Sequence, residues 1–142
     1  MTEATAAKAE RIREQLRQFT GTAAYFQHPL NPLVVYTEGV QFLAEAAEAY
    51  WLIDAIASHF VRLHMAEAMR ADERLQTLQF WRLEKLDSDV GFDAMISARA
   101  DGDCEPFLVG YVGSTDFPLD SVDIWVGRDA EGRWVLYLPS EH

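Results

Sequence analysis

The stretch from Tyr36 to Ala57, YTEGVQFLAEAAEAYWLIDAIA, constrains the fold of this chain most strongly. Thr37 is suited to cap the N-terminus of a helix, and Glu38 follows it at the positive end of the helix dipole. After position 49, apolar residues cover most sides of this helix rather than one stripe. The stretch therefore predicts a long aromatic central helix that the rest of the chain must bury.

The hydrophobic period changes from helical to alternating near residue 75. Before this point, residues 4–18 predict an amphipathic helix, residues 33–36 a short extended piece, and residues 58–74 a loop or a second helix. Five later segments have the alternating or uniformly apolar pattern of strands: residues 78–85, 92–100, 107–112, 122–126 and 134–138. Because short turns separate them, we expect an α+β fold in which the central helix packs on a four- to five-stranded antiparallel C-terminal sheet.

The length and composition predict one domain. A chain of 142 residues is long enough to bury its own core, and its 49% hydrophobic residues exclude a disordered protein. We expect residues 1–142 to form a single domain, with a helical part over about 1–74 and a sheet part over about 75–142. The single cysteine, Cys104, excludes an internal disulfide, and the charged N-terminal segment does not resemble a signal peptide. These features favour a cytoplasmic protein.

The net charge of −11 is concentrated in the C-terminal half. Residues 1–72 carry 6 basic and 9 acidic side chains, whereas residues 73–142 carry 6 basic and 14 acidic ones. An acidic surface repels nucleic acid and anionic membranes and attracts basic protein surfaces. We therefore expect no direct nucleic-acid or membrane binding, and a protein partner with a basic surface. The alternative is that the charge serves only solubility.

No pattern for catalysis, a cofactor or a metal is found. The chain has no glycine-rich phosphate loop and no nucleophile motif. His59 and His64 are five residues apart, which on a helix does not allow both imidazoles to bind one zinc ion. The sequence therefore favours a non-enzymatic protein without a cofactor or a metal.

Several carboxylates remain as candidate site residues. Asp54 lies among apolar neighbours in WLIDAIA, so its carboxylate must reach solvent or a hydrogen-bond donor such as a Tyr, Trp or Arg side chain. A catalytic acid at this position stays open. Asp116, Asp120 and Asp123 form a local acidic cluster that could bind a cation or a basic side chain, although they lack the spacing of a calcium loop. A solvated loop is the competing interpretation.

Four segments of the chain resemble one family. They are LRQFTGT at residues 16–22, the run from Val34 to Ala57, LQFWRLE at residues 78–84, and the ending from TDFPLDSV to LYLPSEH. On these segments the chain is identified as a member of an uncharacterised bacterial family, domain of unknown function 6876. The chain differs from that family by a longer insert after Ala57. The resemblance implies a setting in bacteria and their mobile elements, and no activity.

Two interpretations of different classes remain. In the first, the protein is a non-enzymatic interaction or inhibitor protein whose acidic sheet half binds a basic partner, one candidate being a nucleic-acid-binding protein of a mobile element. In the second, a ligand or substrate binds in a pocket between the central helix and the sheet, lined by Tyr36, Tyr50, Trp51 and Asp54. The charge asymmetry favours the first. A homodimer is a further way to bury the central helix.

Overall fold

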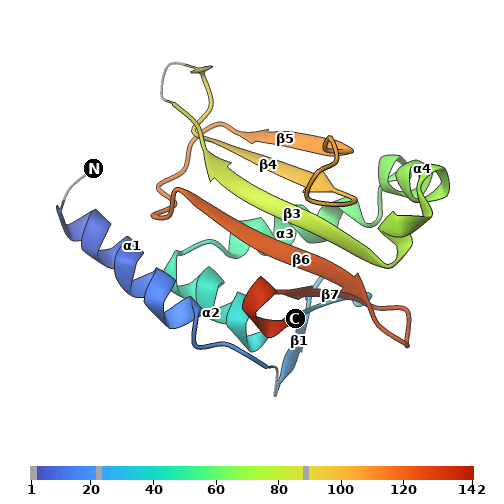
Figure 1. The fold of residues 1–142 in the computed structure, drawn as a ribbon, viewed down its shortest axis with the longest axis horizontal. Coiled ribbons are helices and arrows are strands. Elements are labelled where there is room, and N and C mark those ends of the chain that lie inside the picture. The colour runs from blue at the N-terminus through green and yellow to red at the C-terminus, as the bar shows by residue number, and fades with distance from the viewer. Residues whose placement is uncertain (1–2, 22–23, 88–89) are drawn as a thin grey trace.

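The computed structural model describes residues 3–21, 24–87 and 90–142. Figure 1 shows the helices α1 (Glu3–Leu16), α2 (Glu38–Ala46), α3 (Tyr50–His59) and α4 (Leu63–Ala71), with the 3-10 helices η1 (Glu73–Gln76) and η3 (Pro139–Glu141). The strands are β1 (Tyr25–Gln27), β2 (Val34–Thr37), β3 (Leu78–Lys85), β4 (Ala94–Arg99), β5 (Leu108–Val112), β6 (Ser121–Arg128) and β7 (Trp134–Tyr137). The class is α+β, as predicted.

The strands form one mixed sheet in the order β1-β2-β7-β6-β3-β4-β5. The five C-terminal strands pair antiparallel, as the sequence predicts. The predicted extent of the sheet is wrong, because β2 pairs parallel to β7 and β1 pairs antiparallel to β2. Strand β2 supplies the hydrogen-bond partners that β7 would otherwise lack, and β1 does the same for β2. Part of the predicted helical half therefore belongs to the sheet.

The predicted central helix is in fact two helices. Ala47 ends α2, and Glu48 adopts the left-handed backbone conformation with a φ of 54°. The amide of Ala49 donates to the carbonyl of Ala44 at 2.8 Å, and the amide of Glu48 donates to that of Glu45 at 3.4 Å. This is the hydrogen-bond pattern of a Schellman motif. One long helix was expected because residues 44–49 contain no Gly or Pro to signal a helix end.

Two local predictions in this region are confirmed. Thr37 caps α2, since its side-chain oxygen accepts a hydrogen bond from the amide of Val40 at 3.2 Å. Helix α4 is a second helix between Ser58 and Leu75, and its buried Met65 joins the core.

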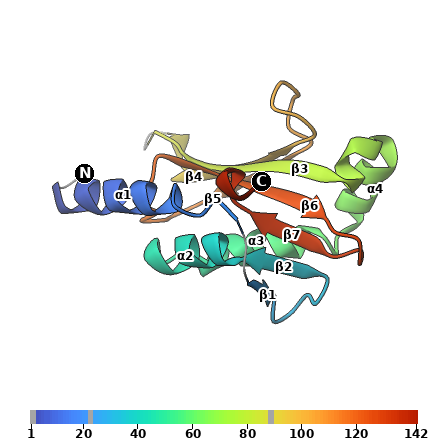
Figure 2. The same ribbon diagram turned by 60° about the horizontal axis from the view of Figure 1, so that its bottom comes forward.

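Helices α1, α2 and α3 lie on one side of the sheet (Figure 2). They share one hydrophobic core with it, including Ile12 of α1, Leu43 of α2, Ile56 of α3, Trp81 of β3, Ile124 of β6 and Leu136 of β7. The buried Gln79 satisfies polar groups inside this core, because it accepts from the indole nitrogen of Trp81 at 3.0 Å and donates to the carbonyl of Leu75 at 2.9 Å. The apolar surface of α2 and α3 is thus buried within the chain itself.

The other face of the sheet, which we call the outer face, lies opposite α1, α2 and α3. Side chains alternate between the two faces along each strand, so Trp81 and Leu83 enter the core while Phe80 and Arg82 lie on the outer face. The last residues of the chain also reach the outer face, where His142 packs beside Trp125. This face and the loops at its ends are accessible to a partner.

Candidate functional site

The interface between α3 and the sheet is closed. The gap lined by Leu52 and Ile56 of α3 and by Trp81, Ile96 and Ile124 of the sheet is too small to hold a water molecule. This part of the interface between α3 and the sheet therefore leaves no room for a ligand. None of the four residues predicted to line such a pocket borders this gap.

Tyr50 and Trp51 lie at a shallow surface recess of about 560 Å³ where α2 meets α3. Ala44, Glu45 and Glu48 complete its walls. The hydroxyl of Tyr50 donates to the Glu45 carboxylate at 3.0 Å. Burial and this hydrogen bond raise the pKa of Tyr50 above its usual value. The phenol is therefore neutral at neutral pH and acts as a donor, not as a base.

Tyr36 of β2 belongs to the hydrophobic core, and its ring stacks on that of Phe26 with the centroids 5.7 Å apart. Burial raises its pKa most, and the negative charges of Asp54 and Glu45 raise it further, because both disfavour a phenolate. The structure thus places Tyr36 and Tyr50 near the same carboxylate, Glu45.

Asp54 pairs with a histidine rather than with Tyr, Trp or Arg. Nε2 of His28 lies 2.8 Å from Oδ1 of Asp54, whose side chain is 65% exposed. Nδ1 of His28 accepts from the amides of Leu30 and Asn31 at 3.2 and 3.1 Å. These two bonds assign the ring hydrogen to Nε2, which donates to Asp54. The pair holds the loop before β2 against α3, and no hydroxyl or thiol of the described residues hydrogen-bonds to this histidine.

The predicted acidic cluster is dispersed. Asp123 on β6 pairs with Arg82 on β3 at 2.7 Å, which raises the pKa of the arginine further. The carboxylate of Asp120 lies 3.9 Å from Arg13 of α1, and Asp116 is exposed in the β5–β6 connection. The described part of the chain contains no group of three acidic, histidine or cysteine side chains arranged to hold a metal ion. The three aspartates therefore do not form one binding site.

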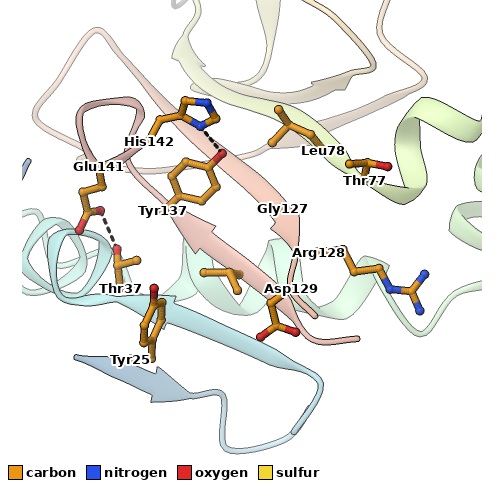
Figure 3. Close-up of a pocket in the computed structure, with 11 residues that line it drawn as sticks. Tyr25, Thr37, Thr77, Leu78, Gly127, Arg128, Asp129, Tyr137, Glu141 and His142 are labelled. Atoms are coloured by element: carbon orange, nitrogen blue, oxygen red, sulfur yellow. Dashed lines mark hydrogen bonds between the residues drawn. The ribbon is translucent and has the colours of Figure 1, made fainter. Parts of the chain in front are cut away.

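The outer face contains a hollow of about 410 Å³, which Figure 3 shows. Gly127 of β6 forms part of its floor, where a side chain would contact the ring of Tyr137 at 3.4 Å. The walls are held by hydrogen bonds within the chain: Tyr137 Oη lies 2.8 Å from Nδ1 of His142, and Thr37 donates to Glu141 at 2.7 Å. These four side chains of the hollow are therefore engaged with one another, while Arg128, which also lines it, packs over the ring of Trp134 at 5.3 Å.

A row of aromatic rings crosses the outer face next to this hollow. Phe80 of β3, Trp125 of β6 and Tyr137 of β7 are cross-strand neighbours, with ring centroids 5.0 and 6.2 Å apart. His142 packs against Trp125 and Tyr137 at 5.2 and 5.8 Å. Aromatic residues beside arginines are enriched in protein–protein interfaces, so the composition of this face favours contact with another protein.

The β4–β5 loop is a candidate site that the prediction from sequence missed. Asp101, Asp103 and Glu105 are all exposed in this loop. None of them has an ion pair with a described residue. Arg74 approaches the loop at the Sγ of Cys104, at 3.7 Å, but its guanidinium is paired with Asp72 at 2.8 Å. The sequence DGDCEP at residues 101–106 carries this signal, since three of its six residues are acidic and none is basic.

Comparisons with known proteins identify the family and no function. A family model described as a family of unknown function (DUF6876) matches residues 10–142. No curated protein and no solved structure matches the chain. None of the helices that the structure describes has the length and apolar composition needed to cross a lipid bilayer.

Proposed function

Because the chain belongs to the DUF6876 family, whose function is unknown, we propose a function from its own surface: it is a non-enzymatic protein that binds a basic segment of a protein partner. The observation that carries this proposal is the β4–β5 loop, where Asp101, Asp103 and Glu105 are exposed and form no ion pair with a described residue. Lysine and arginine are the side chains that such a loop attracts.

The range of electrostatic forces supports the loop as the main contact. At physiological salt, charges are screened over about 8 Å, so the net charge of −11 acts weakly on a distant partner. Carboxylates that already pair with arginine, such as Asp123, are partly neutralised. Three carboxylates within five residues act together on one partner segment. The local run, rather than the total charge, therefore decides where a basic partner binds.

An inhibitor role is consistent with this contact. A partner that uses lysine and arginine side chains to hold nucleic acid would offer the same side chains to the loop. Binding of this protein and of nucleic acid would then be mutually exclusive. Competition by duplex DNA for the captured partner is the measurement that separates an inhibitor from a simple adaptor.

The test is capture of a partner from a lysate of the encoding organism at increasing salt. We expect capture at about 0.05 M NaCl to fall strongly by about 0.5 M, because screening shortens from above 10 Å to below 8 Å. The triple variant Asp101→Asn, Asp103→Asn, Glu105→Gln should lose the same partner. Identification by mass spectrometry should give a protein with a basic surface.

A matched variant controls for total charge. Glu14→Gln, Glu67→Gln and Glu73→Gln remove the same three negative charges from exposed positions outside the sheet. This variant should retain the partner. Equal loss from both variants would show that total charge and not the loop matters, and capture that is insensitive to salt would contradict the proposal.

A further inference from the structure

Strand β5 is an open edge of the sheet. It pairs with β4 on one side, and it lies at the upper border of the sheet in Figure 1. Among the described residues, the backbone of residues 108–112 forms hydrogen bonds only with β4 and with Asp93, the residue before β4. An edge strand offers a row of backbone donors and acceptors that match an added strand.

This edge lacks the usual protection against strand addition. The sequence of β5, LVGYV, contains no charge and no proline. Val109 and Tyr111 are 45% and 57% exposed, and the ring of Tyr111 packs 5.0 Å from Phe92, itself 43% exposed. The opposite edge, β1, is only three residues long, which protects it by length. The β5 edge is therefore the better template for a partner strand.

The charges at the two ends of β5 determine which kind of segment can pair with its open edge. The acidic β4–β5 loop ends just before β5, and Asp116 lies four residues after the end of β5. A second copy paired antiparallel about Gly110 would place the acidic loop of one copy near Asp116 of the other. Like charges at both ends oppose that pairing, whereas lysine or arginine at the end of a partner segment would be attracted.

We propose that an extended segment of the partner adds to the β5 edge as an antiparallel strand, with apolar residues against Val109 and Tyr111 and basic residues against the β4–β5 loop. This inference rests on the proposed function and names its mode of binding. The five residues of β5 offer an edge of about 17 Å, enough for a short segment. In an antiparallel pair, the basic residues follow the apolar ones in the partner segment.

The test uses two synthetic peptides with the intact protein. The probe is Thr-Val-Thr-Val-Thr followed by three arginines, and its twin carries N-methyl groups on the backbone nitrogens that face the edge. The two peptides have the same charge and side chains, but the twin cannot form the strand hydrogen bonds. We expect the twin to bind at least about tenfold more weakly in fluorescence anisotropy, since several backbone bonds are lost. Hydrogen exchange at the amides of residues 108–112 should slow only with the probe.

Each outcome decides between the two proposals. Equal binding of both peptides, abolished in the triple loop variant, would leave basic recognition standing and overturn strand addition. Binding of neither peptide at about 1 mM would also overturn strand addition, and the capture experiment then decides the proposed function by itself. A dimer in sedimentation with slow exchange at residues 108–112 before peptide is added would show that a second copy occupies the edge, and would overturn the proposal.

Discussion

Glu48 has the positive φ that separates α2 from α3. For a residue with a Cβ atom, this left-handed conformation is less stable than the right-handed one by about 1–2 kcal/mol. The Schellman hydrogen bonds around it and the buried side chains of Ala47 and Ala49 hold the turn in place. The turn also sets the angle at which Tyr50 and Trp51 border the surface recess.

Replacing Glu48 by glycine should stabilise the protein. Glycine removes the left-handed penalty but loses more backbone entropy on folding, about 0.5–1 kcal/mol, so we expect the free energy of unfolding to rise by about 0.5–1 kcal/mol. Urea denaturation measures this change. The control Gln41→Gly lies in the right-handed interior of α2 and should lower the free energy of unfolding by about 1 kcal/mol. Destabilisation by both substitutions would refute the left-handed turn.

At the scale of elements, the C-terminal segment locks β2 to the start of α2. The carboxylate of Glu141 accepts from the hydroxyl of Thr37 at 2.7 Å and from the amide of Leu138 at 3.0 Å. Gly39 in the first turn of α2 leaves the space for this contact, since a Cβ there would lie 2.6 Å from Oε1 of Glu141 and 2.8 Å from Cδ1 of Leu138. The close approach, not a special backbone angle, requires glycine.

Gly39→Ala should therefore destabilise the protein although alanine is the better helix former. We expect the clash to lower the free energy of unfolding by about 1–3 kcal/mol, against a gain of about 1 kcal/mol from helix propensity. Thermal and urea denaturation measure the net change in the free energy of unfolding. In a chain that ends at Tyr137 the clashing side chains are gone, so the same substitution should stabilise. A stabilising effect in the full chain would mean that the C-terminal segment is not docked there.

The pairing of elements was only partly predictable for a related reason. The alternating pattern identifies β3 to β7, and short connections make their neighbours antiparallel. The parallel pairing of β2 with β7 joins residues 34–36 to 134–136 across most of the chain. Single-sequence patterns carry no signal for such a distant pair. For the same reason the sequence does not predict that β5 is an edge strand. A strand lies at an edge when no other strand pairs with its second side, and this depends on the order of all the strands in the sheet.

At the scale of the whole molecule, charge repulsion acts on stability. The net charge of −11 opposes compaction, while the ion pairs on the surface, such as Arg82 with Asp123, contribute little each. Repulsion over many unpaired carboxylates therefore outweighs the attraction within a few exposed pairs. Screening by salt should relieve more repulsion than it weakens attraction.

We expect the free energy of unfolding at pH 7 to rise as NaCl increases from about 0.01 to 0.2 M, where the screening length falls from about 30 Å to below 8 Å. Urea, which carries no charge, allows unfolding to be measured at each salt concentration. The triple variant Asp101→Asn, Asp103→Asn, Glu105→Gln should show a smaller rise because it removes unpaired charge. A fall in stability with salt would show that the ion pairs dominate.

The candidate site residues were also only partly predictable from local sequence. Asp54, Asp116, Asp120 and Asp123 were selected because local sequence shows a carboxylate and its neighbours along the chain. Their fate depended on distant residues: His28 pairs with Asp54, and Arg82 pairs with Asp123. That the acidic side chains of residues 101–105 form no ion pair with a described residue could be recognised only from the positions of the basic side chains in the fold.

The amino-acid sequence by itself determined the α+β class, the cap at Thr37, the C-terminal strands and the excess of negative charge, because each depends on residue type or on contacts a few positions apart. The tertiary structure alone decided the turn at Glu48, the parallel β2–β7 pair, the closed α3–sheet interface and which of the described carboxylates form ion pairs. These depend on which distant side chains and strands meet, and that is settled by packing the whole core at once.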